Sequence, residues 1–112
     1  MKKIEAIIRP EKVDPIRIAL TELGIPSMTV TEVLGRGRQK GIAFQWRVGE
    51  YRVELLPKAK IEIVVLDEDV GKTVDAIISN AKTDAAGDGK IFILPVEQVI
   101  RIRTQDKGES AI

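Results

Sequence analysis

The sequence predicts an α+β fold in which one strand–helix–strand unit occurs twice. A β-branched run at residues 3–8, Lys-Ile-Glu-Ala-Ile-Ile, returns at residues 60–65 as Lys-Ile-Glu-Ile-Val-Val. Each run is followed by apolar residues at helical spacing and then by another strand pattern. Two such units pack most simply as one antiparallel sheet with both helices on one face, the ferredoxin-like arrangement. Right-handed crossovers place the two repeated strands in its centre.

The first unit continues with a helix over residues 12–23 and a strand over residues 28–33. Pro15 fits only the first turn of that helix, where a missing N–H is tolerated, and Gly24 suits its C-terminal stop. The apolar stripe of the helix is Val13, Ile16, Leu20 and Leu23.

The second unit continues with a helix that starts near Asp67, where an acidic first turn suits the positive end of the helix dipole. The apolar face of this helix is Val70, Val74, Ile77, Ile78 and Ala81. The last strand pattern splits at Pro95 into residues 91–94 and 99–103. In the second piece Arg101 and Arg103 are expected on one face, ~6–7 Å apart.

A long interruption, about residues 36–55, separates the two units. A loop of this length inside a compact domain is usually functional or disordered. Its cations are Arg36, Arg38, Lys40, Arg47 and Arg52, and its apolar residues include Ile42, Phe44, Trp46, Val48 and Tyr51. It is either a floppy insertion or a segment that orders on a partner, and the second interpretation is favoured.

Composition excludes several classes of function. Among the 112 residues are 18 Lys and Arg and 17 Asp and Glu, a formal net charge of +1. This near-neutral charge gives no general electrostatic attraction to nucleic acid or to a membrane surface. The chain has no Cys and no His, which excludes disulfides, thiol chemistry and the usual zinc sites. No apolar leader or membrane-length apolar run is present, so we expect a single cytoplasmic domain, residues 1–112, without direct membrane insertion.

Two glycine clusters and one arginine pair are candidate anion sites. Residues 35–41 follow a predicted strand, and residues 87–90 precede one. Glycines let backbone N–H groups approach a phosphate, and neighbouring cations add charge. Residues 87–89 could equally form a plain tight turn, and Arg101 and Arg103 could lie on a solvated strand face. Together the three features favour a polyphosphate ligand.

The same segments resemble the PII nitrogen-regulatory family. Residues 83–93, Thr-Asp-Ala-Ala-Gly-Asp-Gly-Lys-Ile-Phe-Ile, fit its C-terminal signature. Residues 35–41 resemble the start of its T-loop, and residues 99–104 match its closing strand. The match is collinear over the whole chain, with a C-terminal tail at about residues 104–112.

The resemblance implies a homotrimer that binds ATP or ADP between neighbouring subunits. The matching nucleotide positions are Ile7, Met28, Thr29, Gly35, Arg36, Gly37, Arg38, Gln39, Glu62, Val64, Gly87, Asp88, Gly89, Lys90, Arg101 and Arg103. In the family, Gln39 and the ATP phosphates hold Mg²⁺, which also chelates 2-oxoglutarate. The matching 2-oxoglutarate positions are Arg9, Gln39, Lys40 and Lys58. 2-Oxoglutarate is therefore expected to bind with Mg-ATP and not with ADP.

The resemblance also implies that the T-loop, about residues 36–55, regulates target proteins of nitrogen or carbon/nitrogen metabolism. Tyr51 matches a tyrosine that many relatives modify, and Arg47 matches one that enters an ammonium transporter. The loop is atypical: Arg36 replaces the usual aromatic residue, and Phe44 and Trp46 suggest a specialised docking surface. The partner is either such a transporter or another protein.

One alternative belongs to the same class of sensor, and two belong to other classes. The chain could be an adenylate-only sensor that has lost the 2-oxoglutarate input, or a small phosphatase-like enzyme on the same fold. Without His or Cys, and with carboxylates mostly at helix starts and on strand faces, we do not expect an enzyme and assign no catalytic residue. An RNA-binding domain would need aromatic residues on the sheet, and Phe92 alone lies in a predicted strand.

Overall fold

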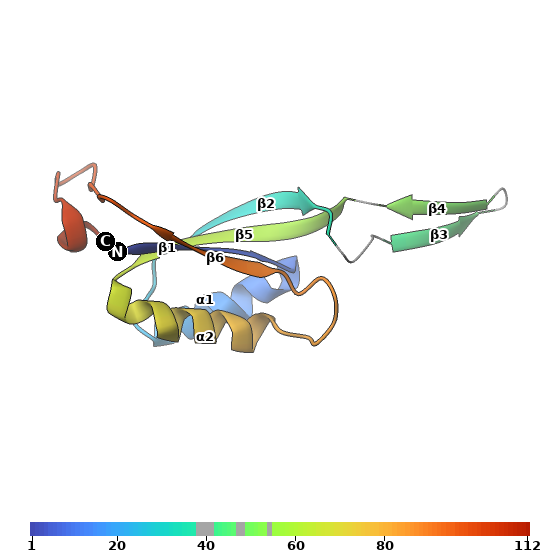
Figure 1. The fold of residues 1–112 in the computed structure, drawn as a ribbon, viewed down its shortest axis with the longest axis horizontal. Coiled ribbons are helices and arrows are strands. Elements are labelled where there is room, and N and C mark those ends of the chain that lie inside the picture. Colours follow the sequence, from blue (N-terminus) through green and yellow to red (C-terminus); the bar gives the residue numbers. More distant parts are fainter. Residues whose placement is uncertain (38–41, 47–48, 54) are drawn as a thin grey trace.

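The computed structural model describes residues 1–37, 42–46, 49–53 and 55–112, and in the two short internal segments it describes the backbone only. Figure 1 shows one sheet covered by two helices on the same side, with a hairpin projecting beyond one end. The elements in chain order are β1 (Lys2–Ile8), η1 (Pro10–Lys12), α1 (Val13–Glu22), β2 (Thr29–Gly35), β3 (Ile42–Trp46), β4 (Gly49–Val53), β5 (Leu56–Val65), η2 (Asp67–Asp69), α2 (Val70–Ala81), β6 (Lys90–Pro95) and η3 (Gly108–Ala111).

The main sheet has the strand order β2-β5-β1-β6, and all of its neighbours are antiparallel. The two repeated strands, β1 and β5, are the central pair, with Ile4 opposite Ile63. The predicted ferredoxin-like fold is thus confirmed. Each helix is preceded by one 3-10 turn, which moves the start of α1 to Val13 and that of α2 to Val70.

The core lies between the sheet and the helices. Alternate residues of β1 and β5 face it, so Ile4 and Ile61 are fully buried. Its buried members are Ile4, Ala6, Ile8, Ile16, Leu20, Ala59, Ile61, Ile63, Val65, Ile77 and Ala81. On the opposite face Glu62 pairs with Lys3 at 3.0 Å and with Lys60 at 3.3 Å, so that face is polar between its apolar positions. No helix within the described ranges is long and apolar enough to span a membrane.

The predicted strand at residues 99–103 is wrong. β6 ends at Pro95, and the chain then makes a local turn closed by an N–H of Gln105 donating to the Arg101 carbonyl (2.8 Å). Ile100 forms only an isolated bridge with Lys107. A strand needs a neighbouring ladder, and the described part of this single chain offers none here. Arg101 instead contacts the carbonyls of Ser110 and Ile112 at 3.4 and 3.3 Å.

The two ends of the sheet carry different parts of the chain. Both termini lie at one end, near the start of β1, and we call this the terminal end (Figure 1). Residue 9, the loop of residues 82–89, and the starts of β5 and β6 lie at the other, which we call the cleft end. The hairpin of β3 and β4, in which Phe44 pairs with Tyr51, projects from the cleft end.

Candidate functional site

The loop between α2 and β6 takes a conformation that depends on glycine. Gly87 and Gly89 have φ angles of +98° and +104°, a region that L-residues rarely adopt. A Cβ atom on Gly89 would lie 1.7 Å from the Ile7 carbonyl oxygen. Only glycine therefore lets the start of β6 approach the end of β1 this closely. The predicted glycine cluster is thus more than a plain turn, because its backbone is pressed against the sheet.

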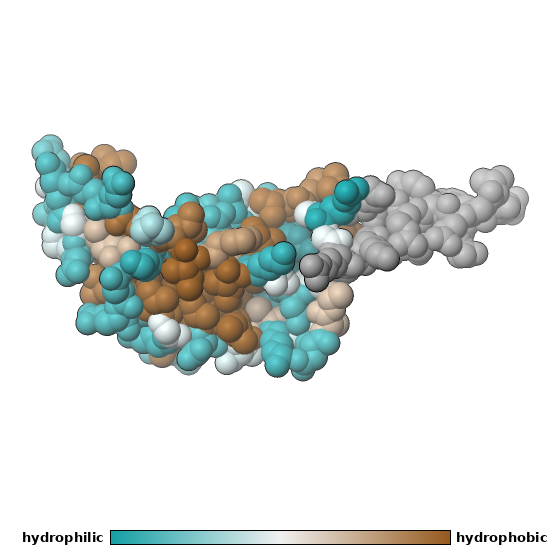
Figure 2. All heavy atoms as spheres, in the orientation of Figure 1, coloured by the Kyte–Doolittle hydropathy of each residue, from teal (hydrophilic) through white to brown (hydrophobic). Residues whose placement is uncertain are grey.

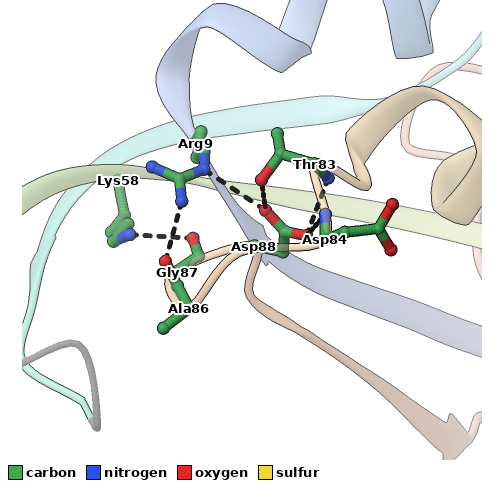
Figure 3. Close-up of polar contacts among 7 residues, drawn as sticks. All are labelled: Arg9, Lys58, Thr83, Asp84, Ala86, Gly87 and Asp88. Atoms are coloured by element: carbon green, nitrogen blue, oxygen red, sulfur yellow. Dashed lines mark hydrogen bonds and ion pairs between the residues drawn. The ribbon is translucent and has the colours of Figure 1, made fainter.

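Asp88 holds this loop together through both carboxylate oxygens (Figure 3). Oδ2 accepts from the backbone N–H of Thr83 at 2.7 Å and from that of Asp84 at 3.0 Å. Oδ1 accepts from the Thr83 hydroxyl and from Nε of Arg9, the latter at 3.4 Å. The bonds from Thr83, hydroxyl first, lower the pKa of Asp88 from 3.8 to about 2. The carboxylate is therefore charged at neutral pH.

Two cations lie against the same loop. Arg9 Nη2 donates to the Ala86 carbonyl at 2.8 Å, and Lys58 Nζ donates to the Gly87 carbonyl at 3.0 Å. Burial, and next the charge of Arg9, lower the pKa of Lys58 below its usual value. Both cations are partly withdrawn from water and repel each other, so an anion placed beside them would relieve both effects.

A cleft of about 420 Å³ opens beside the loop. Its lining residues are Ile7, Gly35, Arg36, Gly37, Lys58, Ala86, Gly87, Gly89, Lys90 and Phe92. Three of these are cations, and no acidic residue is among them within the described chain. The volume suits a small organic ligand, and the charge suits an anionic one.

The structure brings many of the predicted residues together. Ile7, Gly35, Arg36, Gly37, Lys58, Gly87, Gly89 and Lys90 line the cleft. Asp88, on the loop, and Arg9, which follows β1 and donates to the loop, lie beside it. Phe92 also lines the cleft, and the sequence reasoning missed it as a site residue. Its position on β6, two residues after Lys90, was the signal, because alternate strand residues share a face.

Other predicted residues lie apart from the cleft in the single chain. Thr29 pairs with Glu62 in the sheet register, and Met28 packs against the core. Val64 lies opposite Lys3, toward the terminal end. Arg101 and Arg103 are in the C-terminal turn. The resemblance implies that they contact the nucleotide of a neighbouring subunit, and not the nucleotide in the cleft of their own chain. Outside the described residues lie Arg38, Gln39, Lys40 and Arg47, together with the side chains of Phe44, Trp46 and Tyr51.

Comparison with known proteins agrees with this fold and identifies the family. The family described as "Nitrogen regulatory protein P-II" matches residues 1–106. Over all 112 residues the chain is 59% identical to the Nitrogen regulatory protein P-II of Nostoc punctiforme, with both chains fully covered. It is 57% identical to Nitrogen regulatory protein P-II 1 of Escherichia coli (strain K12), again with full coverage. It is 55% identical to Nitrogen regulatory protein P-II 2 of Methanothermobacter thermautotrophicus, covering 97% of that relative. The chain belongs to the nitrogen regulatory protein P-II family.

Proposed function

We propose that this chain is a signal transducer that binds ATP or ADP in the cleft and regulates partner proteins of nitrogen metabolism. The observation that carries the proposal is the cleft itself, where a glycine loop, Lys58 and Lys90 meet. Backbone N–H groups of such a loop, with lysines beside them, are a recurrent phosphate site. The names of the relatives supply the regulatory role.

Within the cleft the proposal places the phosphates near Gly87, Gly89 and Lys90. The apolar side chain of Ile7 lines the same cleft and offers a surface for the base. Glu62 is less suited to bind the nucleotide directly, because Lys3 and Lys60 engage it and lower its pKa. Its contribution is to order the sheet face that borders the site.

The second proposed effector is 2-oxoglutarate, which would bind with ATP. Its carboxylates suit Arg9 and Lys58, which donate to neighbouring carbonyls of the same loop. Mg²⁺ is the metal that the resemblance implies, but the described residues hold no group of three acidic ligands, and both oxygens of Asp88 are engaged. The described residues therefore do not form a protein site for the ion, and the remaining proposed ligands, Gln39 and the phosphates, lie outside them.

We extend the proposal to a homotrimer. Apolar side chains are exposed at both sheet edges: Leu34 is 65% exposed on β2 and Ile93 is 50% exposed on β6. A groove of about 670 Å³ follows the β2 edge, and one of about 390 Å³ lies between β6 and α2. Figure 2 shows the apolar surface that gathers over β6 and α2. Joining the β2 edge of one copy to the β6 edge of the next would cover both and close a ring.

The proposed output is the T-loop hairpin. It projects past the sheet at the cleft end, so a protein could reach it without contacting the core (Figure 1). Docking through Phe44, Trp46 and Arg47, an ammonium transporter as partner, and modification of Tyr51 remain part of this proposal, as does a cytoplasmic location. No catalytic role is assigned, because the described lining of the cleft includes no carboxylate and the acceptor positions of Asp88, beside it, are occupied.

Calorimetric titration tests the proposal. We expect saturable heat with Mg-ATP and with Mg-ADP, and binding of 2-oxoglutarate only after Mg-ATP, with a change in Trp46 fluorescence. Lys90→Gln should weaken both nucleotides about 10-fold or more, within the range for loss of a charge-assisted contact. Lys107→Gln removes the same charge at the terminal end and should leave affinity unchanged. Absence of nucleotide binding would overturn the function, whereas nucleotide binding without 2-oxoglutarate would leave an adenylate-only sensor.

A further inference from the structure

The carboxylate of Asp88 has no acceptor position left for a ligand. An ionised carboxylate offers about four lone-pair directions. Four donors fill them: two backbone N–H groups, from Thr83 and Asp84, the Thr83 hydroxyl, and Nε of Arg9. Direct contact with a ribose hydroxyl or with Mg²⁺ would require one of these bonds to break. A contact with phosphate would bring two negative groups together.

The bonds of Asp88 also join three separate elements into a ring. Thr83 and Asp84 follow α2, Asp88 precedes β6, and Arg9 follows β1. Arg9 closes the ring by donating from Nη2 to the Ala86 carbonyl, two residues before Asp88. The guanidinium is thus attached at two points, Nε and Nη2, which fixes its plane as well as its position. Lys58 Nζ donates to the carbonyl of Gly87, the residue between Ala86 and Asp88 (Figure 3).

We propose that the Asp88 carboxylate has a positioning role that couples the two effectors: it orients Arg9 for the dicarboxylate, and it makes no side-chain contact with the nucleotide. This inference rests on the proposed function. The glycine loop that would bind phosphate and the guanidinium that would bind the dicarboxylate are held by the same ring of hydrogen bonds. Asp88 thereby links the phosphate-binding backbone to a cation for the second anion, and the coupling between the two ligands depends on its charge.

The deciding variant is Asp88→Asn. Its amide oxygen still accepts from the N–H groups of Thr83 and Asp84, so the loop keeps its backbone cap. Its amide nitrogen cannot accept from Arg9, so the bond from Nε is lost and the guanidinium keeps only its bond from Nη2 to the Ala86 carbonyl. The matched control is Asp84→Asn, which removes the same charge four residues away. The Asp84 carboxylate contacts only Lys82 among the described residues and is 77% exposed, and asparagine tolerates its φ of +66°.

Calorimetry gives the first readout. In Asp88→Asn we expect Mg-ATP affinity within about twofold of the parent chain and 2-oxoglutarate affinity about 10-fold lower, inside the range typical of coupling between sites. Asp84→Asn should change neither value. In an Arg9→Gln background, Asp88→Asn should not lower the 2-oxoglutarate affinity further, because Asp88 acts on that ligand only through Arg9. Additive losses in the double variant would overturn the inference, as would a 10-fold loss of ATP affinity in Asp88→Asn.

Nuclear magnetic resonance of the Arg9 Nε–H gives a second readout that needs no ligand. In the parent chain and in Asp84→Asn we expect slow exchange with solvent, and in Asp88→Asn fast exchange, with the Thr83 and Asp84 amides still protected. Fast exchange in the parent chain would refute the ring, and this test stands even if Asp88→Asn fails to fold. A parent chain that binds Mg-ATP but no 2-oxoglutarate refutes the coupling and leaves the nucleotide function standing, whereas loss of both ligands refutes the function itself.

Discussion

The cleft end and the terminal end of the sheet contain similar features, a glycine with positive φ and an aspartate ion pair, but in different surroundings. At each end a glycine with positive φ follows a helix: Gly24 after α1 has a φ of +79°, and Gly89 after α2 has a φ of +104°. At each end an aspartate closes an ion pair. Asp67 binds the amino group of Met1 at 2.9 Å, and Asp88 binds Arg9.

The surroundings of these pairs differ. A Cβ atom on Gly24 would meet nothing within 4 Å, whereas one on Gly89 would collide with the backbone of Ile7. The side chain of Asp67 is 67% exposed and that of Asp88 is 24% exposed. The terminal end therefore relies on contacts that water and salt can replace. The cleft end relies on contacts that permit only one arrangement, as a preorganised binding site requires.

Replacing the two glycines should give the largest difference. Gly24→Ala meets only the backbone penalty of a positive φ, about 1 kcal/mol of unfolding free energy. Gly89→Ala meets that penalty and a backbone collision, so we expect a loss of about 3 kcal/mol or more. Urea denaturation measures both values, and circular dichroism shows whether each variant keeps its helices. Equal losses in the two variants would remove the distinction between the ends.

Acid should reduce the difference in stability between the parent chain and Asp88→Asn within a narrow pH range. Because the Asp88 pKa falls from 3.8 to about 2 on folding, its stabilising effect is fully present well above 3.8. It is lost as pH falls from 3.8 through about 2. The difference in unfolding free energy between the two chains should therefore be constant near neutral pH and shrink toward pH 2.

The Thr83 hydroxyl is the leading cause of that low pKa. Thr83→Ala should therefore move the carboxyl titration of Asp88, followed by ¹³C resonance, back toward 3.8. An unchanged titration would assign the shift to other groups around Asp88.

Asp67→Asn should show the smallest effect. The pairs of Asp67 with Met1 and Lys2 are surface contacts, so the variant should lose little stability, and about 1 M salt should abolish the loss because screening then extends only about 3 Å. At the same salt Asp88→Asn should keep most of its loss, because the lost bond between Asp88 and Arg9 is partly buried and salt screens such pairs less. A salt-resistant loss in Asp67→Asn would show that the terminal end is as constrained as the cleft.

Much of the fold could be predicted because its signals are local. The β-branched runs of β1 and β5 and the helical spacing of Val70, Val74 and Ile77 depend on near neighbours in sequence. The prediction of a strand at residues 99–103 was wrong for the opposite reason. Alternating Ile and Arg residues form a strand only where the edge of another strand is available for pairing. The sequence shows the alternation of these residues, but it does not show whether a neighbouring strand is present.

The ring around Asp88 could not be predicted, because Arg9 and Asp88 are 79 positions apart in the chain. The glycines of this loop indicated a phosphate site, and the same glycines allow the turn in which Asp88 bonds back to Thr83. Threonine and aspartate a few residues before another aspartate are typical of a side-chain cap. That pattern could have indicated that the carboxylate serves the loop.

The placement of both termini at the end opposite the cleft has a practical consequence for anyone who attaches this protein to a surface or a reporter. A linker at either terminus would begin at the end of the sheet opposite the cleft and the hairpin. An extension at Met1 turns its amine into an amide and so gives up the ion pair with Asp67, whereas one at Ile112 keeps it. Immobilisation through the C-terminus is thus the better geometry for a metabolite biosensor built on this chain.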